Sequence, residues 1–230
     1  MATLKNPIVL FPLPSTVFYP KTQLPLHIFE PRYRQMVMDA SEEDLLIGMI
    51  LLKSGWDSDY FGRPPVEKIG CAGKINNLEK LPDGKFNIIL EGLSRFRIIE
   101  ESDKKPYRLA QVEFIKPVND HIPQDDCEKA AQNLINQYET LLEKIIQKQS
   151  VSPTPQFNTR PQFDKCKTVG QIADQIAYSL DWDAKRRQAF LEEIDAQSRV
   201  AQIRSELELK SQIMRVSTIL KTNKVDSRRN

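Results

Sequence analysis

The stretch Ile69–Glu101, IGCAGKINNLEKLPDGKFNIILEGLSRFRIIEE, holds two long runs rich in β-branched residues on either side of a turn. The runs cover residues 69–81 and 86–99, and Leu81-Pro82-Asp83-Gly84 joins them. Proline presets φ for a turn and glycine accepts a positive φ, so the stretch predicts a β-hairpin. Gly92 lies inside the second run, where a residue without a side chain weakens a regular strand. We therefore expect a bulge or a bend at Gly92 and a curved sheet.

Short apolar runs separated by proline, glycine or charged residues continue on both sides of this hairpin, at 8–13, 24–29, 45–52 and 107–115. Such runs are typical of strands. One short helix is expected to interrupt them over residues 32–40, because Pro31 suits the first position of a helix and Tyr33, Met36 and Val37 share one side of it. We predict a small, mixed, barrel-like sheet over residues 1–118.

From residue 119 onward the spacing of the apolar residues changes to alternating steps of four and three. This spacing predicts a helix over residues 125–149 with an apolar stripe of Cys127, Ala131, Leu134, Tyr138, Leu141 and Ile145. Thr168-x-x-Gln171 reads as a capping box at the start of a second helix. A third helix is expected to follow Asp181 or Asp183.

The last helix, expected over residues 196–220, carries two apolar stripes. Val200, Ile203, Leu207 and Met214 form the first, and Leu209, Ile213, Val216 and Leu220 form the second. The first stripe can complete a helical bundle. The second either contacts a neighbouring subunit or packs on the same bundle, and we favour the bundle. Residues 221–230 form a basic tail, which is typical of a solvated terminus.

Several blocks of this sequence resemble the N-terminal, substrate-recognition domain of the ATP-dependent protease Lon. They are Ile8–Leu13, Val17–Pro20, Leu24–Tyr33, the hairpin LPDGKFNIILEGLSRFRI, and a helical block from Gly170 to Gln188. The resemblance spans roughly residues 7–218. It implies an α+β fold, with a curved mixed pseudo-barrel of the PUA-like kind over residues 1–118 and an α-helical bundle over residues 119–220 that ends in a long helix. It also implies recognition of polypeptides, particularly unfolded or degradation-marked ones.

Composition and charge restrict the remaining classes. With 33 basic and 31 acidic residues the net charge is +2, which gives no general attraction to nucleic acid. The longest apolar run, 45–52, is far shorter than the ~20 residues that cross a bilayer, so no membrane contact is expected. Three widely spaced cysteines, Cys71, Cys127 and Cys166, fit reduced thiols in the cytoplasm.

Catalysis is not expected from this chain. Neither Gly-Lys pair, at Gly73 and Gly84, continues as a P-loop, because Ile75 and Phe86 stand where serine or threonine is required. The Ser-Lys catalytic pair of the Lon family lies in a separate domain, for which no residues remain here. With only His27 and His121, a metal cluster or a histidine triad has few options, and His27 is expected to pair with the backbone. We therefore expect a stand-alone, non-enzymatic domain protein without a cofactor or a metal.

The candidate peptide-binding residues are aromatic. Trp56, Tyr60 and Phe61 lie in a loop bounded by Gly55 and Gly62, and aromatic side chains on loops can anchor an apolar peptide. The alternative is that they cover the sheet as a lid over its core, and both possibilities stay open. Phe18 and Tyr19 form a second aromatic turn and are added as candidates.

Two rival functions are an adaptor for one folded partner, such as a Lon or another AAA+ protease, and an RNA-binding module of the PUA-like kind. Near-neutral charge opposes the RNA-binding module. Weak self-association through the last helix is a further expectation.

Overall fold

The computed structural model describes residues 7–59, 62–120, 124–148 and 161–226. Its strands are β1 (Ile8–Leu13), β2 (Gln23–Ile28), β3 (Ile47–Leu51), β4 (Ile69–Lys80), β5 (Phe86–Ser102) and β6 (Arg108–Ile115). The helix α1 (Pro31–Glu42) lies between β2 and β3, and the 3-10 helix η1 (Trp56–Asp59) lies between β3 and β4. After β6 follow α2 (Gln124–Lys148), the 3-10 helix η2 (Phe163–Lys165), α3 (Val169–Ser179), α4 (Ala184–Glu192) and α5 (Ala196–Asp226).

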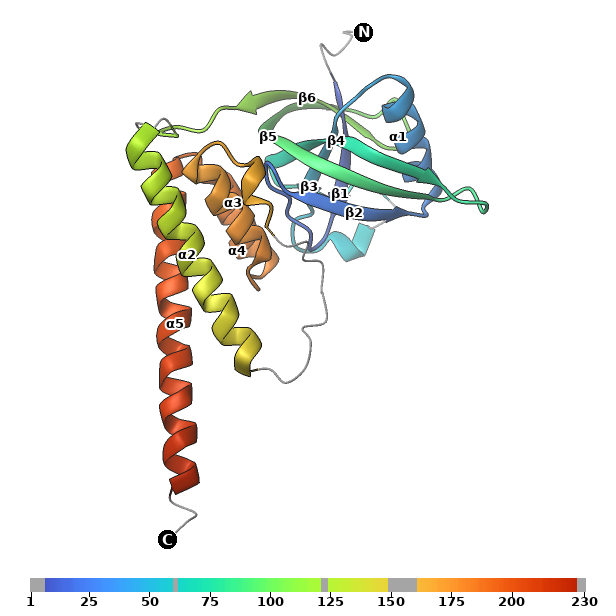
Figure 1. Cartoon of the computed structure of the whole chain (residues 1–230). Helices are drawn as coiled ribbons and strands as arrows, with labels where there is room; N and C mark the ends of the chain where they lie inside the picture. Colours follow the sequence, from blue (N-terminus) through green and yellow to red (C-terminus); the bar gives the residue numbers. More distant parts are fainter. Residues whose placement is uncertain (1–6, 60–61, 121–123, 149–160, 227–230) are drawn as a thin grey trace.

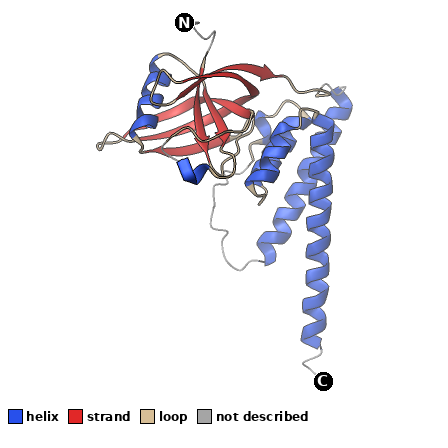
Figure 2. Cartoon of the chain, turned by 180° about the vertical axis from the view of Figure 1, so that it is seen from behind, coloured by secondary structure: helices blue, strands red, loops and turns tan. Residues whose placement is uncertain are grey.

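The six strands form one sheet in the order β2-β5-β4-β3-β1-β6, and a further pairing of β5 with β6 closes it into a barrel (Figures 1 and 2). The long strand β5 makes this closure possible, because its first residues pair with β2 and its last residues pair with β6. β1 and β3 are parallel, whereas the other pairs are antiparallel. The predicted α+β fold with a mixed, barrel-like sheet is therefore confirmed.

The hairpin of β4 and β5 turns as its sequence predicts. The amide N–H of Gly84 donates to the carbonyl oxygen of Leu81 at 3.0 Å, and Gly84 has a φ of 79°. A bulge follows in β5, because Ala72 pairs with Ser94 whereas Gly73 pairs with Gly92. A Cβ atom on Gly92 would lie 2.1 Å from the carbonyl oxygen of Tyr19. Glycine at this position thus allows the backbone at Tyr19 to lie in close contact with β5.

The helix starts also follow the sequence. Thr168 Oγ1 accepts from the amide of Gln171 at 3.3 Å, and Gln171 Oε1 accepts from the amide of Lys167 at 2.7 Å. The Gln171 side chain thus reaches one residue further back than the reciprocal position of a capping box. Asp183, rather than Asp181, caps α4, because its Oδ1 accepts from the amide of Arg186 at 2.7 Å.

The second apolar stripe of the last helix is not covered, so the prediction that it packs on the same bundle is wrong. Leu209, Ile213 and Val216 are 53%, 57% and 55% exposed, whereas Ile203 and Leu207 of the first stripe are buried. The helices α2 and α3 contact α5, which extends past the end of α2 (Figure 1). The helices α2 and α3 pack against the side of α5 that carries the first stripe, and the second stripe faces solvent. The side chain of Leu220 lies outside the described residues.

The barrel and the helices are joined by a buried charge cluster. Asp174 of α3 accepts two hydrogen bonds of 2.8 Å from Arg95 of β5, and Nε of Arg199 in α5 lies 3.1 Å from its Oδ1. Tyr19 packs edge-on against Tyr178 of α3, and one hydrophobic core runs from the barrel into the helices. These contacts fix the barrel and the helices to each other. The division into two subdomains at residues 118 and 119 stays a prediction.

Candidate functional site

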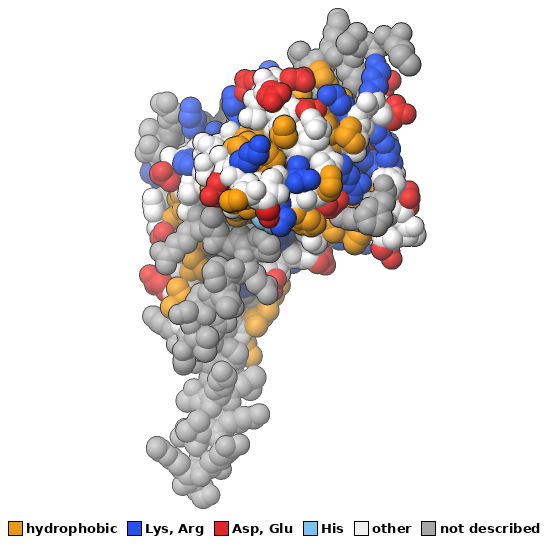
Figure 3. Space-filling model, turned by 90° about the vertical axis from the view of Figure 1, so that its right-hand side faces the viewer, with side chains coloured by type: hydrophobic (Ala, Val, Ile, Leu, Met, Phe, Trp, Pro, Cys, Tyr) orange, Lys and Arg blue, Asp and Glu red, His pale blue; other side chains and the backbone are white. Residues whose placement is uncertain are grey.

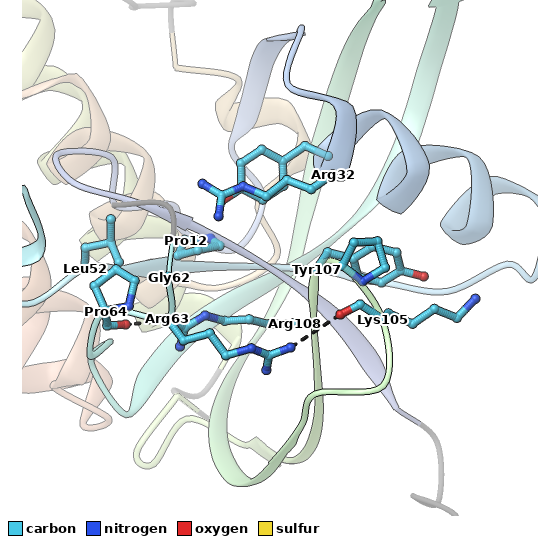
Figure 4. A pocket seen from close by; sticks show the side chains of 11 residues that line it. Pro12, Arg32, Leu52, Gly62, Arg63, Pro64, Lys105, Tyr107 and Arg108 are labelled. Carbon is cyan, nitrogen blue, oxygen red and sulfur yellow. Dashed lines mark hydrogen bonds between the residues drawn. The ribbon is translucent and has the colours of Figure 1, made fainter. Parts of the chain in front are cut away.

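A pocket of about 340 Å³ opens at the end of the barrel where β6 begins (Figure 4). The pairing of β1 with β6 ends at the pair of Leu10 and Arg108, whereas β1 itself continues to Leu13. The last residues of β1 therefore extend past the start of β6. The first turn of α1 and the loops before β4 and β6 surround the space beside them.

The floor and the rim of this pocket differ in chemistry. The floor consists of side chains that are buried and mainly apolar, contributed by Pro12, Tyr33, Leu52, Pro64 and Tyr107. The rim carries cations, of which Arg63 and Lys105 are exposed and Arg32 is half-buried. Arg108 is a fourth cation, and it is buried, with 7% of its surface exposed. The pocket thus offers an apolar surface directly next to positive charge.

Three of these cations are paired with carboxylates. The pairs are Arg32 with Glu30 at 3.1 Å, Lys105 with Asp39 at 2.8 Å and Arg108 with Glu101 at 3.1 Å. The Arg63 guanidinium donates instead to two backbone carbonyl oxygens, those of Ser102 at 3.1 Å and Lys105 at 3.4 Å. The four basic side chains in Figure 4 come from three parts of the chain: Arg32 from α1, Arg63 from the loop before β4, and Lys105 with Arg108 from the segment where β6 begins.

Asp39 of α1 holds the loop before β6 in place. Its carboxylate accepts from Tyr107 OH at 2.5 Å, from Lys105 Nζ at 2.8 Å and from Gln35 Nε2 at 2.5 Å. Burial alone would raise the pKa of Asp39, but these hydrogen bonds outweigh it and lower the pKa. Burial and the bond to Asp39 raise the pKa of Tyr107, and the same carboxylate raises the pKa of Lys105. Asp39 thus positions two residues that line the pocket.

The predicted aromatic loop leads directly into this pocket. Trp56 lies half-exposed in η1, after Gly55 with a φ of 85°. Tyr60 and Phe61 lie outside the described residues. The chain then continues into Gly62, Arg63 and Pro64, all three of which line the pocket. The role of the three aromatic residues in peptide binding stays a prediction.

The prediction that Phe18 and Tyr19 bind peptide is wrong, because both side chains are buried. Phe18 is 1% exposed and Tyr19 is 0% exposed. Tyr19 packs edge-on against Phe190, and its hydroxyl donates to the carbonyl oxygen of Arg187 at 2.8 Å. Side chains so deeply buried present no surface to a polypeptide. Their aromatic turn joins the barrel to the helices.

Sequence reasoning did not find the basic rim or Asp39. One signal was available, because Lys105-Pro106-Tyr107-Arg108 places two cations beside an aromatic residue just before a strand. Arg63 gave no such signal on its own. Its position in the pocket depends on the loop folding back over the end of the barrel.

No group of three or more His, Cys, Asp or Glu side chains that could hold a metal ion occurs among the described residues. His27 is exposed, and its Nδ1 lies 2.8 Å from Asn87 Oδ1, so the prediction that it pairs with the backbone is wrong. Across the described ranges, no helix is both long and apolar enough to cross a membrane.

Figure 3 views the side of the barrel that carries α1. On this face, basic side chains are scattered among hydrophobic, acidic and uncharged ones. A nucleic-acid surface usually gathers Lys and Arg into one patch or stripe. This face does not favour RNA binding.

Comparison with solved structures places the fold. A crystal structure titled as a Lon N-terminal domain protein from Xanthomonas campestris superposes with a TM-score of 0.57 and 21% identity, over 86% of this chain and 97% of that one. The N-terminal domain of a Mycobacterium avium complex Lon protease gives a TM-score of 0.56 at 14% identity, over 88% of this chain and 98% of that one. At these identities the likeness shows the fold alone.

Comparison of sequences gives the family. The Lon protease 2 of Myxococcus xanthus is 26% identical over 218 residues, which are 95% of this chain and 25% of that protein. The Lon protease of Syntrophus aciditrophicus is 28% identical over 196 residues, 84% of this chain and 24% of that protein. The chain thus spans about a quarter of the length of these curated relatives. The family described as the ATP-dependent protease La (LON) substrate-binding domain matches residues 7–208, and this chain belongs to that family.

Proposed function

We propose that this chain recognises polypeptides that are unfolded or marked for degradation, without catalysing a reaction itself. The observation that carries the proposal is the match of residues 7–208 to a substrate-binding domain. The pocket supports it, because an apolar floor suits side chains that a folded protein would keep inside. Such binding gains roughly 25 cal/mol for each Å² of apolar surface removed from water and needs no nucleotide.

The binding surface that we propose combines the pocket with the aromatic loop before it. Trp56 supplies half-exposed aromatic surface, and Gly62–Pro64 connect this loop to the pocket. Aromatic residues on a loop offer large contact area at low cost in side-chain entropy. Tyr60 and Phe61 belong to the same proposed surface on sequence grounds alone.

The test is a titration of the purified protein against a fluorescently labelled, permanently unfolded polypeptide and against its folded counterpart, followed by anisotropy without nucleotide. We expect saturable binding of the unfolded chain only. Alanine substitution of Trp56, Tyr60 and Phe61 together should weaken this binding and leave the melting temperature nearly unchanged. The matched control is Phe114→Ala, which removes an aromatic residue of β6 that is 46% exposed and outside the pocket. Equal binding by all variants would contradict the proposed surface.

A second candidate function is an adaptor for one folded partner, such as an AAA+ protease. The uncovered stripe of α5 favours it, because Leu209, Ile213 and Val216 form a straight apolar surface that a folded helix or a second copy of this chain could cover. We propose weak self-association through the same stripe. Sedimentation at increasing protein concentration tests it, and Ile213→Glu should abolish any association without changing the fold.

We place this function in the cytoplasm. Cys71 and Cys166 both have free thiols, which fits a reducing compartment.

A further inference from the structure

The division of the pocket into floor and rim restricts the ligands that it fits. A purely apolar ligand would form no ionic or hydrogen-bonding contact with Arg63 and Lys105. A purely charged ligand would leave the apolar floor of Tyr33, Pro64 and Tyr107 exposed to water. The best fit is a ligand with an apolar group next to an anion. The volume of about 340 Å³ lies at the lower end of the ~300–1,000 Å³ that is usual for ligand pockets. It therefore holds a short segment of a chain and not a folded element.

Arg63 is the rim cation best prepared to bind an anion. Among the described residues, no ion pair joins Arg63 to a carboxylate, since its two hydrogen bonds go to the carbonyl oxygens of Ser102 and Lys105. These oxygens hold the guanidinium in one orientation but do not neutralise its charge. A guanidinium has five N–H donors, so donors remain for a ligand. An ion held in place before binding loses less entropy when the ligand arrives.

The carboxylates around the pocket select the kind of anion. Glu30, Asp39 and Glu101 each neutralise one pocket cation, and Asp59 packs against Gly62 beside the rim. This arrangement leaves little net positive charge. A phosphate, which carries up to two negative charges, would meet repulsion from these groups. A single carboxylate, which can take the planar fork of a guanidinium, fits better.

We infer that this pocket binds a polypeptide carboxylate that stands next to an apolar side chain, with the carboxylate on Arg63 and the side chain on the floor between Tyr33 and Tyr107. The C-terminal residue of a chain offers this combination when its side chain is apolar, and an internal Asp or Glu beside an apolar residue offers it as well. This inference rests on the proposed function and names the part of the client that is recognised.

The experiment uses three labelled ten-residue peptides and measures anisotropy with the full chain. The first ends in leucine with a free carboxylate, the second is the same peptide as its C-terminal amide, and the third is the amide with an internal aspartate before the leucine. We expect the free acid to bind about tenfold more tightly than the plain amide, as one charge-assisted hydrogen bond allows. If only the free acid binds more tightly than the plain amide, the pocket selects a chain terminus, and if only the aspartate peptide does, it selects a side chain. Equal gains for both peptides show that the pocket accepts either carboxylate.

The variants test whether Arg63 carries the preference. In Arg63→Gln the ratio between acid and amide should fall close to one, and because this side chain is exposed the fold should persist. The control is Arg97→Gln, which removes an arginine that is 46% exposed and pairs with Glu113 on β5 and β6, away from the pocket. It should leave the ratio unchanged.

The outcomes of the two proposals are separable. A long unfolded polypeptide with an amidated C terminus is titrated in parallel and reports polypeptide recognition without a terminal carboxylate. If this long polypeptide binds but neither the free acid nor the aspartate peptide binds more tightly than the plain amide, or if no short peptide binds, the inference on the pocket is overturned and the proposed function stands. If acid and amide differ but Arg63→Gln preserves the difference, the assignment to Arg63 is overturned.

Discussion

Replacing Asp174 by asparagine should destabilise the protein strongly, because this carboxylate is the counter-ion of two buried arginines. Asp174 is 1% exposed, Arg95 is 4% exposed and Arg199 is 1% exposed. In the Asp174→Asn variant, the side chain keeps its size, but the negative charge between the two guanidinium groups is lost. Removing one partner of a buried ion pair leaves an uncompensated charge away from water.

The expected size of the effect is about 3–5 kcal/mol, the usual cost of breaking a buried ion pair from one side. For a chain of this length, each kcal/mol shifts the melting temperature by about 2–4 °C. The Asp174→Asn variant should therefore melt about 6–20 °C below the parent protein. Since total stabilities are about 5–15 kcal/mol, a fraction of the variant can be unfolded even without heating.

The assay is urea denaturation followed by far-ultraviolet circular dichroism, together with a thermal melt. The matched control is Glu113→Gln, which removes the carboxylate from the surface pair of Arg97 and Glu113, where the side chains are 46% and 61% exposed. An exposed pair contributes about 0–1 kcal/mol, so this control should melt close to the parent. A loss below about 1 kcal/mol in Asp174→Asn would refute the reasoning that this buried cluster joins the barrel to the helices.

Three further predictions concern the fold and the pocket. Gly92→Ala should cost about 1–3 kcal/mol, measured in urea, because its Cβ would meet the carbonyl oxygen of Tyr19 at 2.1 Å. Ile203→Ala, at a fully buried site of α5, should cost about 2–5 kcal/mol, whereas Ile213→Ala on the exposed stripe should change stability by less than about 0.5 kcal/mol. Asp39→Asn should destabilise the protein at neutral pH, and the difference from the parent should shrink as the pH falls below about 4. The pKa of Asp39 is lower in the folded protein than in the unfolded chain, so the stability that Asp39 contributes is present above the unfolded-state pKa and is lost as the pH falls through the folded-state pKa. A difference in stability between the variant and the parent that stays constant from pH 7 to pH 3 would contradict this.

Much of the fold could be predicted because its signals are local. The turn at Gly84, the bulge at Gly92 and the cap at Thr168 each depend on a few neighbouring residues. The prediction for the second stripe of α5 is wrong for the opposite reason, because its outcome depends on residues far away in the sequence. Periodicity shows that Leu209 and Ile213 share a face, but it does not show whether another helix covers that face.

The pocket itself was not predicted from the sequence. The loop with Trp56 continues into Gly62, Arg63 and Pro64 of the pocket, and its role in peptide binding stays a prediction, whereas the turn with Phe18 and Tyr19 has a similar composition and lies in the core. Composition reports that a side chain favours contact with apolar groups. Whether those groups belong to the same chain or to a ligand depends on burial, which the sequence does not state.

The sequence by itself determined the strands, the helices and their order, the family and the absence of a P-loop within these residues. Only the tertiary structure decided which residues form the pocket and which arginine of its rim lacks a carboxylate partner among the described residues. The physical reason is separation along the chain. Pro12, Arg63 and Arg108 meet because β6 ends its pairing with β1 at Leu10 and a loop folds over the open end. Local sequence patterns do not show which distant residues come together in the folded chain.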